Sequence, residues 1–226
     1  MSGPRARIPA RRAELSQYFL SESRAPRIVR LLPIEPADHI IEIGAGRGAL
    51  TRPLLARTSR VDAVEVDPWL AESLRGRFGE KLTVIEADFL SQALPVTPWR
   101  AVGNIPYGRS AEIIRYLTAP EHLPDDAWLV VQKEYAYRLC GRPFVRESLN
   151  SLALKPFWHL QVIDRLARSD FSPPLAVDSV LFWLQKRQRP LLNLKEKASY
   201  KSILKASFIE RSDSVVGALR PWLSKI

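Results

Sequence analysis

Short apolar segments alternate with amphipathic ones through most of this chain, and this alternation restricts the possible folds more than any other feature. Strand–helix alternation is typical of a parallel, doubly wound sheet with helices on both of its faces. We therefore expect an α/β protein. The expected strands span residues 39–44, 61–67, 82–88, 99–107, 127–132, 157–166 and 178–186.

The two ends of the chain differ from its alternating middle. Residues 15–32 have a helical pattern, which Pro26 should break or restart because proline lacks the N–H that a helix interior needs. Residues 190–226 show helical periodicity and no strand pattern. The expected organisation is a basic arm over 1–14, an α/β domain over 15–188 and a small helical appendage over 189–226.

Basic residues are concentrated at the same two ends. Residues 1–30 hold seven arginines and two acidic residues, and residues 186–226 hold ten basic and three acidic residues. The formal charge of the whole chain is +10, which favours an anionic partner such as nucleic acid or an anionic membrane surface. Solvated termini without a partner would give the same pattern.

Several classes of protein are excluded by what the sequence lacks. The single cysteine, Cys140, rules out a disulfide framework and a cysteine-based zinc site, and the three histidines are too scattered to suggest a metal cluster. The sequence has no apolar run of about 18 residues that could span a membrane. Its first residues lack the apolar core of a signal peptide. We expect a soluble, cytoplasmic protein that needs no metal and acts as a monomer.

A glycine-rich turn follows the expected strand at 39–44 and opens a helix. Gly44, Gly46 and Gly48 would let the backbone approach a ligand closely. Together with Ala49, the first two also satisfy the dinucleotide pattern G-x-G-x-x-A. A nicotinamide-dependent oxidoreductase is therefore one alternative, and a plain tight turn is another.

Three acidic residues, Glu42, Glu65 and Asp88, are expected at successive strand ends, on the edge of the sheet where α/β proteins bind ligands. S-adenosyl-L-methionine presents a ribose diol, an adenine amine and an ammonium group, which are all donors, and it has no phosphate. The acids suit it better than a pyrophosphate. We expect Glu65 to accept from the ribose hydroxyls and Asp88 from the adenine amine, with helix capping as the alternative.

The segment Asn104-Ile105-Pro106-Tyr107 ends the fourth expected strand. The exocyclic amine of adenine is a poor nucleophile because its lone pair is delocalised into the ring. The Asn104 side-chain oxygen and a backbone carbonyl could accept from its two N–H groups, with the carbonyl of Pro106 held rigidly, and so free the lone pair for methyl transfer. Tyr107 could stack on the extruded base. An ordinary turn is the alternative.

Six segments in this order resemble the rRNA adenine N6-methyltransferases: SQYFL (16–20), EIGAGRGALT (42–51), AVEVD (63–67), ADFL (87–90), GNIPYGRS (103–110) and FSPPLAVDSV (171–180). The resemblance runs from about residue 11 to 188. It implies a Rossmann-like domain that depends on S-adenosyl-L-methionine, with a small C-terminal helical domain, and S-adenosyl-L-homocysteine as a product.

The resemblance also implies roles for single residues. Gln17, Gly44 and Gly46 would line the methionine end of the cofactor, and Phe171 would be the second aromatic face around a flipped adenine. The whole expected cofactor-binding set is Gln17, Tyr18, Leu20, Gly44, Ala45, Gly46, Glu65, Val66, Asp88, Phe89 and Asn104. The expected catalytic set is Asn104, Ile105, Pro106, Tyr107 and Phe171.

The family has two branches. Ile105 and the EYAYRL stretch after the fifth strand look like the erythromycin-resistance (Erm) type, which methylates one adenine of 23S rRNA. This modification confers resistance to macrolide, lincosamide and streptogramin B antibiotics. The alternative is the branch of dimethyladenosine transferases, which act on 16S or 18S rRNA in ribosome assembly.

Two features depart from the family pattern. Tyr18 stands where the family has asparagine, and this keeps open a non-enzymatic RNA-binding protein that retains the fold. The helical appendage is short for the family, so contact with RNA is expected to depend more on the arginines of residues 5–30.

Overall fold

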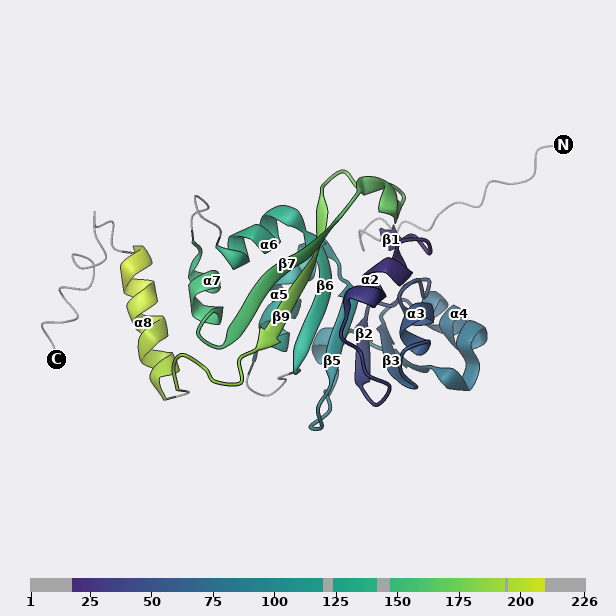
Figure 1. Ribbon diagram of the computed structural model, residues 1–226, viewed down its shortest axis with the longest axis horizontal. Helices are drawn as coiled ribbons and strands as arrows, with labels where there is room; N and C mark the ends of the chain where they lie inside the picture. Colours follow the sequence, from purple (N-terminus) through teal and green to yellow (C-terminus); the bar gives the residue numbers. More distant parts are fainter. Residues whose placement is uncertain (1–17, 120–123, 142–146, 194, 210–226) are drawn as a thin grey trace, which may run out of the picture.

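The computed structural model describes residues 18–119, 124–141, 147–193 and 195–209 (Figure 1). The expected arm over 1–14 and the candidate residue Gln17 lie outside this part of the chain. The main element is a seven-stranded sheet in the order β4-β3-β2-β5-β6-β9-β7. Its strands are β2 (His39–Ile43), β3 (Arg60–Glu65), β4 (Thr83–Glu86), β5 (Arg100–Asn104), β6 (Asp126–Gln132), β7 (Trp158–Leu166) and β9 (Ser179–Lys186).

Strands β4, β3, β2, β5 and β6 run parallel, as the alternation of strands and helices predicts. The strand order reverses between β2 and β5, because the chain builds β3 and β4 on one side of β2 and then returns to its other side. Open α/β sheets bind ligands outside the carboxyl ends of the strands at such a point. The strands β2 and β5 end at Ile43 and Asn104, so the glycine turn and the segment 104–107 leave the sheet beside each other.

Gly103 determines how closely these two strands approach. It pairs with Ile43, and a Cβ atom added to Gly103 would lie 2.6 Å from the carbonyl oxygen of Ile43. A larger residue would therefore push the strands apart directly beneath the site.

The last strands depart from the purely parallel sheet that the alternation predicts. β9 runs antiparallel to both of its neighbours, β6 and β7. No helix long enough for a crossover separates β7 from β9 among the described residues; the connection contains only the 3₁₀ turn η4 (Arg168–Asp170) and the two-residue strand β8 (Phe171–Ser172). Without a crossover, consecutive strands pair in opposite directions.

Alternating strand residues build a core on each face of the sheet. Ile40 and Val102 pack with the helices α2 (Ala25–Leu31), α3 (Thr51–Leu55) and α4 (Pro68–Phe78). Their neighbours Ile41 and Ala101 pack on the opposite face with α5 (Ser110–Leu117) and α6 (Lys133–Cys140). Figure 1 shows the resulting three layers, with the sheet between two sets of helices. Buried strands of a parallel sheet are apolar on both faces for this reason.

The expected helix over residues 15–32 is only partly correct. Phe19 and Leu20 form a short strand, β1, which pairs antiparallel with β8 so that Leu20 lies opposite Phe171. The helix α2 starts at Ala25, and Pro26 lies in its first turn. Proline is tolerated there because the first N–H groups of a helix have no partner within the helix, so Pro26 marks a beginning and not a break.

A short helical layer follows the sheet at the far side from α4. The helix α7 (Leu149–Leu154) contacts α8 (Glu196–Ile209), where the Tyr200 hydroxyl donates to the Leu152 carbonyl oxygen over 3.0 Å. Figure 1 shows α8 at the left edge, next to α7. The remaining short turns are η1 (Gly79–Lys81), η2 (Phe89–Ser91) and η3 (Tyr107–Arg109). Among the described helices, none is both long and apolar enough to cross a membrane.

Candidate active site

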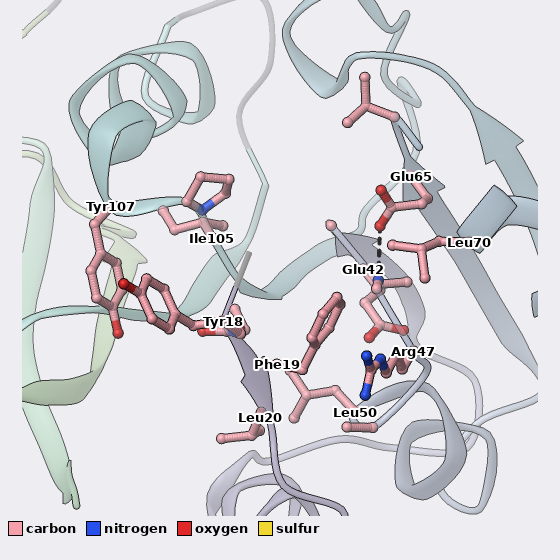
Figure 2. Close-up of a pocket in the computed structure, with 17 residues that line it drawn as sticks. Tyr18, Phe19, Leu20, Glu42, Arg47, Leu50, Glu65, Leu70, Ile105 and Tyr107 are labelled. Atoms are coloured by element: carbon pink, nitrogen blue, oxygen red, sulfur yellow. Dashed lines mark hydrogen bonds between the residues drawn. The ribbon is translucent and has the colours of Figure 1, made fainter. Parts of the chain in front are cut away.

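A pocket opens at the carboxyl ends of β2 and β5, where the strand order reverses (Figure 2). Its walls come from four separate segments: β1, the glycine turn, the end of β3 and the segment after β5. Glu65 and Leu70 lie at one end of the pocket and the two tyrosines at the other, as Figure 2 shows. Of the expected site residues, the pocket brings together Tyr18, Leu20, Gly44, Ala45, Gly46, Glu65, Val66, Asn104, Ile105, Pro106 and Tyr107.

The glycine turn has a backbone conformation that other residues rarely adopt. The φ angles of Gly44, Gly46 and Gly48 are 66°, 56° and 78°. The Gly46 N–H donates to a Glu65 carboxylate oxygen over 2.8 Å, and a Cβ atom at Gly46 would lie 3.2 Å from the Phe19 ring. Positive φ and close contact with an aromatic ring together explain why glycine stands at position 46.

Glu65 ends β3 and is 4% exposed. Its carboxylate accepts from the backbone N–H groups of Gly46 and Asp67, over 2.8 and 3.0 Å. Burial raises the pKa of Glu65, and the two backbone donors partly offset this rise. Because a carboxylate has about four lone-pair sites, Glu65 retains the capacity to accept from ligand hydroxyls in the pocket.

Glu42 lies beneath the glycine turn and is 1% exposed. Its carboxyl group accepts a 2.6 Å hydrogen bond from the Thr51 hydroxyl. Burial raises the pKa of Glu42 to about 8, despite the hydrogen bond from Thr51. The group is therefore substantially protonated near neutral pH, and a protonated carboxyl can also donate a hydrogen bond.

The third expected acid, Asp88, is not among the residues that line this pocket. One of its carboxylate oxygens accepts from the Leu90 N–H over 3.0 Å, and the other pairs with the Arg109 guanidinium, also over 3.0 Å. Its neighbour Phe89 is buried and meets the Tyr116 ring edge-on, with 5.5 Å between ring centroids. Val66, in contrast, lines the pocket and is 47% exposed.

Asn104 faces the pocket in a fixed orientation. Its amide nitrogen donates to the Tyr18 carbonyl oxygen over 2.8 Å. A carbonyl oxygen can only accept, so this contact assigns the donor side of the amide and leaves the Asn104 side-chain oxygen as an acceptor for a ligand.

The three residues after Asn104 serve different purposes. Ile105 is 1% exposed and anchors the segment in the core, while Pro106 is exposed. The Pro106 carbonyl, one expected acceptor for the target amine, already accepts from the Arg109 N–H over 3.0 Å and from the Ser110 hydroxyl over 3.2 Å. These two donors fix the start of α5 and occupy both lone pairs of that carbonyl.

Tyr107 lines the pocket, and its hydroxyl lies 2.5 Å from the Ser179 hydroxyl. Burial raises the pKa of Tyr107 to about 12, and the nearby Tyr18 phenol adds to the rise. Phe171, the expected second aromatic face, lies in β8 and is 3% exposed. It packs into the core opposite Leu20 and does not line this pocket.

Six residues that line the pocket are absent from the expected cofactor-binding and catalytic sets: Phe19, Glu42, Arg47, Ala49, Leu50 and Leu70. The Arg47 guanidinium lies over the Phe19 ring, 4.3 Å from its centroid, as Figure 2 shows. Such stacking of a cation on an aromatic face is attractive. The sequence could have indicated Arg47, because it lies between Gly46 and Gly48, and a ligand that contacts these glycines also lies close to the residue between them.

The described residues contain no group of three or more histidine, cysteine, aspartate or glutamate side chains that could hold a metal ion. The pocket itself offers hydrogen-bond acceptors, aromatic rings and the glycine turn to a ligand.

The chain is similar in sequence and in fold to known proteins. Residues 10–224 match the family described as ribosomal RNA adenine dimethylase. An rRNA adenine N-6-methyltransferase of Streptomyces fradiae is 35% identical over 214 residues, which cover 92% of this chain and 66% of that protein. A ribosomal RNA small subunit methyltransferase A of Chlorobium phaeobacteroides is 32% identical, over 92% of this chain and 78% of that protein.

A solved structure has the same architecture. The crystal structure of the 23S rRNA methyltransferase ErmE superimposes with a TM-score of 0.81 and 31% identity, over 90% of this chain and 84% of that chain. The match of the family over nearly the whole chain, together with these relatives, shows that the chain belongs to the ribosomal RNA adenine dimethylase family.

Proposed function

We propose that this protein transfers a methyl group from S-adenosyl-L-methionine to the N6 amine of an adenine in 23S rRNA, and that the modification confers resistance to macrolide, lincosamide and streptogramin B antibiotics. The observation that carries the proposal is the fixed orientation of Asn104, whose amide nitrogen is held by the Tyr18 carbonyl oxygen. Its side-chain oxygen is then available where an adenine amine would need an acceptor.

The chemistry of the residues that line the pocket supports the proposed cofactor. When bound, S-adenosyl-L-methionine supplies an electrophilic methyl group on a sulfonium, with S-adenosyl-L-homocysteine as the leaving product. Glu65 would accept from the ribose hydroxyls, and the glycine turn would lie against the methionine end. Arg47 is the one cation among the residues that line the pocket, and it lies in the same turn. Gln17, Asp88 and Phe89 remain proposed cofactor contacts, although Asp88 would have to share its carboxylate with Arg109.

The target adenine would lie at the opposite end of the pocket. The Asn104 side-chain oxygen would accept from one N–H of the amine, and the Ile105 carbonyl would accept from the other, because the Pro106 carbonyl is occupied by Arg109 and Ser110. Acceptance from both N–H groups favours tetrahedral geometry at nitrogen and frees its lone pair. Tyr107 would stack on the flipped base.

A flipped adenine that is stacked on both of its faces requires a second aromatic ring opposite Tyr107. Phe171 stays a proposed candidate, although its burial leaves little of its ring for a base in this arrangement. Tyr18 lies beside Tyr107 in Figure 2 and lines the same pocket, and its ring is the nearer candidate.

Contact with RNA is proposed for a basic surface at the other end of β9. His159, Gln185, Lys186, Arg187, Gln188 and Arg189 line a shallow polar hollow there. Lys186 and Arg189 are exposed and form no ion pair within the described residues, so their charge is available to phosphates. Tyr107 contacts Ser179 at one end of β9, and Lys186 lies at the other end. Seven residues of a strand span roughly 24 Å, so a folded RNA could contact both the pocket and this surface.

The test of the proposal is Asn104→Ala. Methyl transfer to protein-free 23S rRNA should fall by about 30-fold to 1,000-fold, because the missing acceptor matters most as the amine rehybridises. Affinity for S-adenosyl-L-methionine, measured by calorimetry, should stay within about threefold of the wild type. Transfer within about threefold of the wild type would refute the role of Asn104.

The alternative function is dimethylation of an adenine in 16S rRNA during ribosome assembly. The similarity to the small subunit methyltransferase favours this alternative, since its identity of 32% is close to the 35% of the Streptomyces protein. The two functions are separated by offering 23S and 16S rRNA in parallel and locating the modified nucleotide.

A further inference from the structure

Tyr107 is tied to a strand that lies far from it in the sequence. Its hydroxyl and the Ser179 hydroxyl are 2.5 Å apart. Within the described residues, this is the one hydrogen bond that the Tyr107 side chain makes. The contact joins the segment after β5 to the first residue of β9.

Ser179 is held rigidly. It is 1% exposed, and it pairs with Gln132 of β6 on one side and with Leu166 of β7 on the other. The residue before it is fixed as well, because Asp178 forms ion pairs with Lys133 and Arg168, over 2.9 and 3.0 Å. The Ser179 hydroxyl therefore has little freedom to follow a movement of the Tyr107 ring.

The backbone of Tyr107 is held in a turn, where its carbonyl oxygen accepts from the Ser110 N–H, so the freedom of this residue lies in its side chain. It begins the turn η3 directly after the exposed Pro106, and its side chain is half-buried at the pocket wall. The ring packs against the core, and the hydroxyl contact adds the hydrogen bond that fixes its rotation about the two side-chain bonds. The raised pKa keeps the phenol protonated, so the hydrogen bond persists over the ordinary pH range.

We infer that Ser179 is a positioning residue that holds the Tyr107 ring in the orientation in which it contacts the target adenine. The inference rests on the proposed function. A stacked base needs the ring at a fixed angle, and misplacement of a positioned group by about 1 Å can cost about a hundredfold in rate. Anchoring the ring before the base arrives avoids that loss.

The first test measures kinetics of Ser179→Ala, Tyr107→Phe and the double variant with protein-free 23S rRNA. Ser179→Ala should lower kcat about tenfold, while KM for the RNA and affinity for S-adenosyl-L-methionine stay within about twofold. Tyr107→Phe keeps the ring and removes the same anchor, so the double variant should be no slower than either single variant. Ser179→Thr, which retains a hydroxyl, should restore most of the rate.

A matched control separates positioning from a general loss of stability. Ser151, in α7 and away from the pocket, is also fully buried, and its hydroxyl contacts the Leu139 carbonyl oxygen over 2.7 Å and a Glu147 carboxylate oxygen over 2.5 Å. Ser151→Ala should lower the melting temperature about as much as Ser179→Ala and leave kcat unchanged. Equal kcat values for Ser179→Ala and wild type, or independent effects that multiply in the double variant, would overturn the inference.

A spectroscopic test does not depend on the identity of the RNA. The Tyr107 hydroxyl proton should give a distinct, slowly exchanging NMR signal, assigned by its loss in Tyr107→Phe, and Ser179→Ala should abolish it. A signal that survives Ser179→Ala would show that the anchor lies elsewhere. If the wild type methylates no rRNA, the proposed function fails, while this signal still decides whether Ser179 holds the ring.

Discussion

Glu65 connects the glycine turn to the end of β3 and also faces the ligand pocket. Glu65→Gln replaces a charged acceptor by a neutral amide opposite a diol, which weakens binding by about 1–2 kcal/mol. Calorimetry should therefore show about 5-fold to 30-fold weaker binding of S-adenosyl-L-methionine. Glu72→Gln makes the same change at an exposed position of α4 and should leave affinity unchanged. Unaltered affinity in Glu65→Gln would contradict the proposed cofactor site.

Glu42 makes stability depend on pH. Burial raises its pKa in the folded protein from 4.5 to about 8, so between these values the folded state binds more protons than the unfolded state. The free energy of unfolding should then decrease as pH rises through this window, by at most about 1.4 kcal/mol per pH unit.

Glu42→Gln removes this titration. Urea unfolding at about pH 5.5 and about pH 7.5 should show the variant gaining stability relative to the wild type at the higher pH. A difference between variant and wild type that is the same at both pH values would show that Glu42 is not held in its protonated form.

Single residues differed in how well the sequence predicted them. Gly44, Glu65 and Asn104 lie in the pocket as expected, because parallel strands end at one edge of the sheet and the motifs follow those ends. Asp88 and Phe171 also follow strand positions, yet one pairs with Arg109 and the other packs against the core. Both contacts depend on residues far away in the chain, which a motif does not reveal.

At the level of elements, the glycine turn is the part whose shape depends most on sequence. Gly46→Ala places a Cβ at a positive φ and against the Phe19 ring, which should cost about 1–2 kcal/mol of stability and weaken cofactor binding. Gly76→Ala is a matched control, because a Cβ there meets nothing within 4 Å and its helix gains about 0.5–1 kcal/mol. Thermal unfolding and calorimetry of both variants check this, and equal behaviour would show that the turn tolerates a side chain.

The main strands and helices were predictable because each has its own local pattern of apolar residues. β1 was not, since two residues carry no periodicity and form a strand only by pairing with β8, more than 150 residues later. The antiparallel direction of β9 follows from the short connection after β7, whereas the sequence pattern predicted a parallel sheet. Elements defined by distant partners are the ones that local reasoning misses.

At the scale of the whole molecule, the basic surface at the end of β9 should contribute to RNA affinity through phosphates. Replacing Lys186 and Arg189 by glutamine should weaken RNA binding and reduce the log–log salt slope by a little under one for each phosphate that is no longer neutralised. The matched control replaces Arg60 and Lys81 by glutamine, since both are exposed, on β3 and η1, at the other side of the sheet. Identical salt slopes for the two pairs would move the RNA surface elsewhere.

The central claim concerns one adenine of 23S rRNA, and mass spectrometry of nuclease fragments of rRNA from cells that express this chain tests it most directly. The account predicts one or two added methyl groups on the adenine of the macrolide-binding site of 23S rRNA, and their loss in cells expressing Asn104→Ala. An unmethylated adenine at that site, or a modification confined to 16S rRNA, would contradict it.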